Sequence, residues 1–441
     1  MNKKTENKAF SPWQWVPSLY FAQGLPYVVV MSVAVILFKR MGMSNTDIAL
    51  YTSGLNLPWV IKPLWSPLVD LLKTKRWWIV VMQILVGAGL AGIALTIQGP
   101  LAFRYCLAFM WLLAFSSATH DIAADGFYML GLNEKKQAYF VGIRNTFYRF
   151  AVIFGQGILV MFAGWLEQRY AREMPETAAI PQAWSLTFYL LTILFALLFV
   201  YHYLFLPHPR RDTCTLPPQQ ASAGRVFKEF LGTFTSFFQK KHIVSALIFI
   251  LLYRFAEAQL VKITSPFLLD TPATGGLALS TAEVGFIYGT IGVIALTIGG
   301  IVGGIAMARR GLKSCLWPMT IAMNLPNIVY LYLSFARPES IGIISGCVAI
   351  EQFGYGFGFT SLTYFMMLFS NGKHQTAHYA ICTGFMALGL MLPGMISGWI
   401  EESIGYRAFF VWIMLCTIPS FWATHLVRKN LTDNHSDNSS R

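Results

Sequence analysis

Apolar and polar positions along this chain fall into long blocks rather than into the short periods of a soluble helix or strand. The apolar blocks are about 20 residues or more in length, which is enough for an α-helix to cross the hydrocarbon core of a bilayer. The pattern predicts an all-α membrane protein with 12 transmembrane helices, at residues 16–38, 48–70, 77–97, 102–131, 139–165, 184–206, 243–269, 283–308, 314–335, 340–369, 375–400 and 405–427.

A polar interval over residues 207–241, rich in proline and basic residues, divides these predicted helices into two sets of six. Within it Phe227, Phe230, Leu231 and Phe234 are spaced as on the apolar face of a helix lying on a membrane surface. We therefore expect an N-terminal six-helix bundle over 1–206, a cytoplasmic linker with an amphipathic helix over 207–241, a C-terminal bundle over 242–428 and a disordered tail over 429–441.

The second set of helices repeats features of the first in the same order. FAQG at Phe21–Gly24 in helix 1 corresponds to FAEA at Phe255–Ala258 in helix 7. AGWLE at Ala163–Glu167 closes helix 5, as SGWIE at Ser397–Glu401 closes helix 11. Parallel repeats of six helices are typical of major-facilitator transporters. The sequence therefore predicts the major-facilitator fold, built from two six-helix pseudo-repeats.

Composition and charge support a membrane protein with a fixed orientation. Hydrophobic residues make up 55% of the 441 residues and charged residues 12%, whereas a soluble protein carries about a quarter charged residues. The net charge of +13 does not indicate nucleic-acid binding, because the basic residues lie 21 to 7 on one side of the predicted spans. This bias predicts that both termini are cytoplasmic. The six cysteines are scattered without metal-ligand spacing, so no metal site and no cofactor are predicted.

A few charged residues lie inside the predicted spans, where each costs about 2.5–3.5 kcal/mol on insertion scales. Asp121 and Asp125 are four residues apart and share one face of helix 4. Two interpretations are open: a polar cluster that only holds helices together, or a role in handling substrate or protons. We favour the second because intramembrane acids are usually functional. The basic residues inside spans are Lys62, Arg144, Arg149, Arg254 and Lys262.

The depth of each charge predicts which of them pair. Counted from the inner ends of helices 4 and 5, Asp125 lies level with Arg144, and Asp121 lies level with Arg149, with Lys62 between the two levels. A buried charge left alone costs more than a paired one. We therefore expect a connected polar cluster of these five residues in the cytoplasmic half of the first bundle.

Helix 7 contains a second group of charges. The repeat places Glu257 where helix 1 has the neutral Gln23, and Arg254 can share a helix face with Glu257. Glu257 and Glu351 both lie near mid-membrane, where coupling-ion sites usually occur. Burial favours the protonated carboxyl group and Arg254 favours the carboxylate. We predict that Glu257 is the proton-coupling group, with Asp125 second and Glu351 third; the alternative is a purely structural Arg254–Glu257 pair.

Four motifs in this order resemble the muropeptide permease family of the AmpG type, and more distantly the acetyl-CoA transporters of internal membranes. They are FAQGLP from Phe21, KPLWSPLVD at Lys62–Asp70, FSSATHDIAADGF at Phe115–Phe127 and YRFAVIFGQG at Tyr148–Gly157. The resemblance continues through Leu252–Ala258 and Thr376–Tyr406, so it covers nearly all of the membrane part. Members of the family often have Lys and Asp where this chain has Arg254 and Glu257, a change that preserves both charges.

The resemblance implies proton-driven import of anhydromuramyl-peptide fragments across the bacterial inner membrane, from periplasm to cytoplasm. The expected partners are an anionic or amphiphilic sugar-peptide and membrane lipids, with the protein a monomer. The alternative cargo is another bulky anion, such as acetyl-CoA or a siderophore-like compound. An enzyme is disfavoured because the sequence shows no nucleophile with a base and no metal cluster. The residues expected to bind substrate or to gate are Gln23, Lys62, Asp121, Arg144, Arg149, Arg254, Tyr128 and Tyr355.

Overall fold

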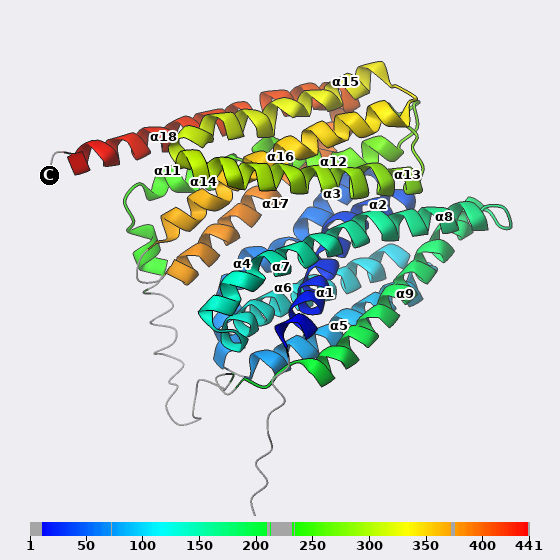
Figure 1. Ribbon diagram of the computed structural model, residues 1–441. Helices are drawn as coiled ribbons and strands as arrows, with labels where there is room; N and C mark the ends of the chain where they lie inside the picture. The colour runs from blue at the N-terminus through cyan, green and yellow to red at the C-terminus, as the bar shows by residue number, and fades with distance from the viewer. Residues whose placement is uncertain are drawn as a thin grey trace, which may run out of the picture.

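The computed structural model describes residues 11–71, 73–209, 212, 232, 234–371 and 375–439 (Figure 1). Within these ranges the regular structure is helical and no strand occurs, as the sequence predicts. We call residues 11–209 the first half and residues 234–439 the second half. Much of the predicted linker, including Phe227, Phe230 and Leu231 of its amphipathic helix, lies outside the described residues.

The first half contains six predicted spans, of which the first, second and fifth are divided into shorter pieces. Two of them contain a π-helical turn, η2 or η3, in which the backbone widens within a continuous helix. The elements are η1 (Pro12–Gln14), α1 (Val16–Val28), η2 (Val29–Val33), α2 (Ala34–Arg40), α3 (Asn45–Gly54), α4 (Leu57–Leu71), α5 (Lys75–Thr96), α6 (Ala102–Gly131), α7 (Glu134–Val152), η3 (Ile153–Leu159), α8 (Val160–Tyr170) and α9 (Glu176–Phe205).

The second half contains the other six spans. Span 7 is interrupted between α11 and α12, and a third π-helical turn, η4, interrupts span 8. The elements are α11 (Ile243–Leu252), α12 (Phe255–Leu269), α13 (Thr281–Phe286), η4 (Ile287–Gly292), α14 (Val293–Asn324), η5 (Leu325–Asn327), α15 (Ile328–Ala336), α16 (Ile341–Ser370), α17 (Gln375–Leu415) and α18 (Ile418–Ser439).

Eight helical stretches among the described residues are long and apolar enough to cross a membrane. Two of these, Thr281–Ala336 and His378–Asn430, contain 56 and 53 residues, and a helix of that length would be about 80 Å long, far more than one crossing requires. Each stretch reverses direction at a glycine with a positive φ, Gly311 (φ 69°) or Gly405 (φ 75°). Residues that carry a side chain rarely adopt this backbone conformation. Each stretch therefore supplies two of the predicted spans, and the remaining two, 48–70 and 340–369, are also helical.

The C-terminal segment differs from the predicted disordered tail over 429–441. Helix α18 continues from the last span to Ser439. The segment contains no proline or glycine that would end a helix at the membrane surface, so the preceding span extends into it without a stop signal.

Each half packs mainly within itself, and the two halves meet along a seam. In Figure 1 the first half, coloured blue to green, lies below the second half, coloured green to red. At the seam α3 packs against α17, α2 against α12, α8 against α13 and η3 against η4. Several of these contacts lie on the right of Figure 1, where α8 turns back into α9. We call this the far end of the bundle.

Glycines allow close approach of the two halves along this seam. A Cβ added at Gly398 of α17 would lie 2.0 Å from the backbone oxygen of Asn45 in α3, and one added at Gly289 of η4 would lie 2.0 Å from that of Gln156 in η3. Such distances leave no room for any side chain. The seam therefore depends on glycine in both places.

Candidate functional site

The acidic face of α6 forms the centre of a polar cluster in the first half. Lys62 of α4 pairs with one oxygen of Asp121, and the amide of Gln23 in α1 donates a hydrogen bond to the other oxygen. Three helices therefore converge on a single carboxylate. Since α4, α6 and α1 are separated in the sequence, this carboxylate links the helices as well as carrying charge.

One turn further along α6, Asp125 forms the second ion pair of this cluster. Arg144 of α7 lies 3.4 Å from Asp125, as depth counting predicted. Tyr20 of α1 stands between them: its hydroxyl donates to Asp125 (3.0 Å) and accepts from Arg144 (2.9 Å). The Arg144 guanidinium also lies 4.7 Å from the ring centre of Tyr20 and 5.1 Å from that of Tyr128. Tyr128 therefore contacts the cluster through its ring, and Tyr20 is a member that the sequence analysis missed.

The predicted pairing of Asp121 with Arg149 is wrong. Lys62 and Gln23 donate hydrogen bonds to the two carboxylate oxygens of Asp121 instead. Among the described residues Arg149 forms no ion pair. The physical reason is that α1 packs against both α6 and α7 and presents Gln23 to Asp121. Equal depth on two helices is therefore not sufficient for contact.

The charged side chains of this cluster are only partly buried. Between 22 and 39% of the side-chain surface of Lys62, Asp121, Arg144 and Asp125 is exposed. A charge at this depth that faced lipid would be costly, whereas charges within spans usually face a bundle interior or water. We infer that this face of the first half is in contact with water.

The interruption of span 7 positions the charges of the second half. Arg254 adopts a non-helical conformation just before α12 begins, and Glu257 lies in the first turn of α12. The Arg254 guanidinium donates to one oxygen of Glu257 through Nε (3.2 Å) and Nη2 (2.9 Å). Arg254 also donates to the Tyr355 hydroxyl (2.6 Å). The predicted contact of Arg254 with Glu257 is thus present, in a nearly buried setting, at a helix N-terminus that favours negative charge.

Glu351 of α16 is buried in different surroundings. Its carboxyl group accepts hydrogen bonds from the hydroxyl of Tyr330 (3.2 Å) and the amide of Gln352 (2.9 Å). Among the described residues no cation forms an ion pair with it. The two acids of the second half therefore differ in their partners. Glu257 is paired with a cation, whereas Glu351 is hydrogen-bonded by neutral groups.

A polar network that the sequence did not predict lies at the far end, and we call it the far-end network. Lys39 of α2 lies 2.7 Å from Asp270, at the end of α12, and donates to Asn45 of α3 (2.8 Å). Asn45 in turn donates to Glu401 of α17 (2.6 Å) and to the hydroxyl of Tyr406 (2.9 Å), which itself donates to Asp270 (2.6 Å). Most of these bonds join the first half to the second.

A matching contact lies on the other side of the seam. Glu167, at the end of span 5, accepts from Thr281 at the start of α13 (2.7 Å), from Trp184 (2.7 Å) and from Arg40 (3.1 Å). Glu167 and Glu401 are the last residues of the repeated AGWLE and SGWIE segments. Each reaches across the seam to a residue that opens a helix of the opposite half. The repeat was therefore the sequence signal for this network.

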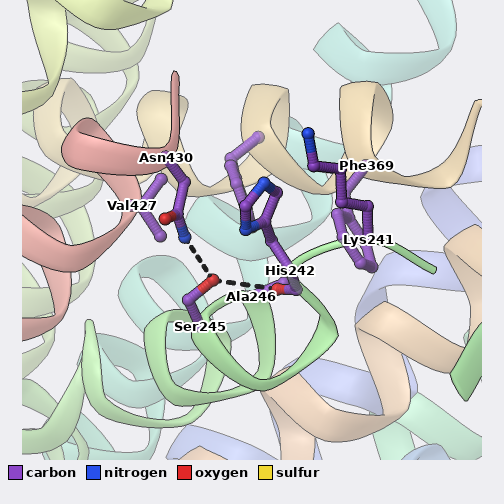
Figure 2. A pocket seen from close by; sticks show the side chains of 8 residues that line it. Lys241, His242, Ser245, Ala246, Phe369, Val427 and Asn430 are labelled. Atoms are coloured by element: carbon purple, nitrogen blue, oxygen red, sulfur yellow. Dashed lines mark hydrogen bonds between the residues drawn. The ribbon is translucent and has the colours of Figure 1, made fainter. Parts of the chain in front are cut away.

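A small pocket of about 100 Å³ lies between the start of α11, the end of α16 and the middle of α18, lined by Lys241, His242, Ser245, Phe365, Phe369 and Asn430 among others. Figure 2 shows the Asn430 amide bonded to the Ser245 hydroxyl at its rim. Binding sites for drug-sized ligands occupy about 300–1,000 Å³. This pocket is too small for a sugar-peptide, and it lies apart from both charge clusters.

We expect the pairing at Asp121 to be visible in a double-mutant cycle. Asp121→Asn or Lys62→Met alone should destabilise the protein by about 2 kcal/mol, less than the 3–5 kcal/mol of a fully buried pair because about a quarter of each side chain is exposed (26 and 22%). The double variant should lose less than the sum of the two. Melting temperatures in detergent measure this coupling.

Arg149→Gln is the matched control for this cycle. Because Arg149 does not contact Asp121, its effect should add to that of Asp121→Asn. Additivity for Lys62 with coupling for Arg149 would instead support the pairing predicted from depth.

Comparisons with known proteins agree with this architecture. The model of the Major Facilitator Superfamily matches residues 18–378. The chain is 25% identical to the putative transporter AmpG 4 of Rickettsia conorii, over 92% of this chain and 93% of that one. It is 24% identical to the anhydromuropeptide permease of Escherichia coli strain K12, over 94% of this chain and 79% of that one.

Solved structures of transporters have the same fold. A D-xylose–proton symporter superposes with a TM-score of 0.69 at 13% identity, covering 94% of this chain and 96% of the other. The nucleoside transporter NupG superposes with a TM-score of 0.68 at 13% identity, covering 94 and 98%.

Proposed function

The chain belongs to the Major Facilitator Superfamily, and from this membership we propose that it imports anhydromuramyl-peptide fragments from the periplasm, driven by the proton gradient. That it is a multi-span transporter of this superfamily follows from the family match and the fold. The cargo, the coupling ion, the direction of transport and the location in a bacterial inner membrane are our proposal. The relatives named as anhydromuropeptide permease and AmpG transporters support the cargo.

The charges within the spans support an anionic cargo. The spans contain five basic residues but only four acids, Asp121, Asp125, Glu257 and Glu351. An excess positive charge therefore remains even when every acid is ionised. Arg149 forms no ion pair among the described residues. An uncompensated guanidinium at this depth is costly, and a carboxylate on the cargo would neutralise it.

The single observation that best supports proton coupling is the Arg254–Glu257 pair. Glu257 engages two nitrogens of Arg254. Protonation of Glu257 would remove the negative charge that holds the guanidinium, leaving Arg254 able to bind an anionic cargo. Loss of the proton would restore the pair and displace the anion. Cargo and proton would then travel together.

The seam supports a cycle in which the two halves rock against each other around the central charges. The far-end network joins the halves at one end of the molecule. If the excess of basic residues marks the cytoplasmic side, the far end faces the periplasm. The structure then corresponds to the state that is closed to the periplasm.

Thermal-shift measurements with a panel of ligands test the cargo. We expect an anhydromuramyl-peptide to raise the melting temperature, because a ligand at a hundred times its Kd stabilises by about 2.7 kcal/mol. Acetyl-CoA and a siderophore should leave it unchanged. A rise with either of these and none with the muropeptide would assign the protein to a different cargo.

A further inference from the structure

Lys262 of α12 is a buried basic residue that has no carboxylate partner in the described part of the protein. Only 3% of the residue is exposed. Its ammonium group donates to the hydroxyl of Thr52 at 3.3 Å, and no described carboxylate forms an ion pair with it. By contrast, three other bases of the spans, Lys62, Arg144 and Arg254, each form an ion pair with an acid. Lys262 is therefore the most buried of the span bases that lack one.

The nearest acid along the same helix is already engaged. Glu257 lies five residues before Lys262, and both of its short contacts are with Arg254. A buried ammonium that is hydrogen-bonded only to a hydroxyl remains costly, because buried charges are normally paired. The site thus has the basic donor of an anion-binding site, but it lacks the anion.

Lys262 lies in the seam between the halves. Thr52 and Ser53 belong to α3 of the first half, and Gly394 belongs to α17 of the second. A Cβ added at Gly394 would lie 2.7 Å from the Ser53 hydroxyl and 3.5 Å from Cγ of Lys262. The Ser53 hydroxyl is buried and has no hydrogen-bond partner among the described residues. Two polar groups, one of them unsatisfied, therefore point into the same junction of α3, α12 and α17.

We propose that Lys262 binds a carboxylate of the cargo when the far end of the seam is open, an inference that rests on the proposed transport function. Separation of the halves would move Thr52 and Ser53 away from the ammonium group and expose it to the periplasmic side. A carboxylate of the cargo then supplies the missing counter-ion. Lys262 lies between the far end and the Arg254–Glu257 pair along α12, so an anion would reach it first.

Charge-selective labelling at Ser53 tests this site without any cargo. Ser53→Cys is placed in a background without the six native cysteines and labelled from the outside with an anionic or a cationic methanethiosulfonate reagent. We expect the anionic reagent to react faster, and this preference to fall about tenfold in Lys262→Met, since a local field of one sign raises the approach rate of opposite charges by about that factor or more. Lys262→Arg should retain it.

Two outcomes of the labelling would overturn the proposal. If the preference for the anionic reagent is the same with Lys262 and with Met, the ammonium does not attract anions there. If Ser53→Cys never reacts from outside, opening of the far end does not uncover the site. Neither result depends on which cargo the protein carries.

Uptake into proteoliposomes then tests the role in transport. The probes are an anhydromuramyl-tripeptide and the same compound with its carboxylates converted to amides. Lys262→Met should raise KM about tenfold for the acid and less than twofold for the amide, a difference of about 1.4 kcal/mol. Equal losses for both probes would indicate a purely structural role. If wild type transports neither probe while the labelling preference holds, the proposed cargo fails and the anion site stands.

Discussion

Glu257→Gln is expected to abolish the accumulation of cargo against its gradient while sparing exchange of cargo between equal pools. Glutamine keeps the shape of the side chain and cannot release a proton. Glu257 is nearly buried and holds Arg254 through two nitrogens. If proton binding controls that pair, the variant resembles the protonated state permanently, so it can bind cargo and reorient but gains nothing from a pH gradient.

Glu351→Gln is the matched control, because it changes a second buried acid on a neighbouring helix. Glu351 is bound by Tyr330 and Gln352 rather than by a cation, so its removal frees no guanidinium. We expect this variant to keep proton-driven accumulation. Paired measurements of uphill uptake and counterflow separate the two acids. Normal accumulation in Glu257→Gln, with its loss in Glu351→Gln, would move the coupling role to Glu351.

Gly398→Ala is expected to reduce transport to background by preventing closure of the far end. The added Cβ would lie 2.0 Å from the backbone oxygen of Asn45 and 2.4 Å from its carbonyl carbon. Backbone atoms cannot move aside as a flexible side chain can, so α17 and α3 must separate. That separation also breaks the hydrogen bonds from Asn45 to Glu401 and Tyr406.

Gly346→Ala is the matched control for this variant. Gly346 lies in α16 and no atom of the described residues is within 4 Å of its added Cβ, so transport should be retained. Distances between spin labels on α3 and α17 should show the open far end in Gly398→Ala alone. Wild-type uptake by Gly398→Ala would show that transport does not require this close approach.

The sequence predicts the spans and the local charge pairs well, because both depend on neighbours along the chain. The contact of Arg254 with Glu257 was expected from their spacing of three residues, although Arg254 lies just before α12 rather than within it. The Asp125–Arg144 contact follows from depth. Depth fails for Arg149, because the position of α1 between α6 and α7 depends on packing that no single helix encodes.

The far-end network could not be predicted from residue spacing. Lys39 and Asp270 lie 231 residues apart, and they meet only in a state in which the halves are closed at that end. The repeated segments that end in Glu167 and Glu401 indicated related positions, but they did not show that both cross the seam. The sequence showed Lys262 as a basic residue within a span, whereas only the structure shows that no described carboxylate forms an ion pair with it.

Uptake of a labelled anhydromuramyl-peptide into proteoliposomes under an imposed pH gradient tests the central claim most directly. We predict that cargo accumulates inside above its external concentration when the side corresponding to the periplasm is acidic. Because the negative charge of an anionic cargo offsets the charge of the proton that travels with it, accumulation should rise with the imposed pH difference rather than with the membrane potential. A protonophore should collapse it. Equilibration without accumulation, whatever the gradient, would contradict proton-driven import.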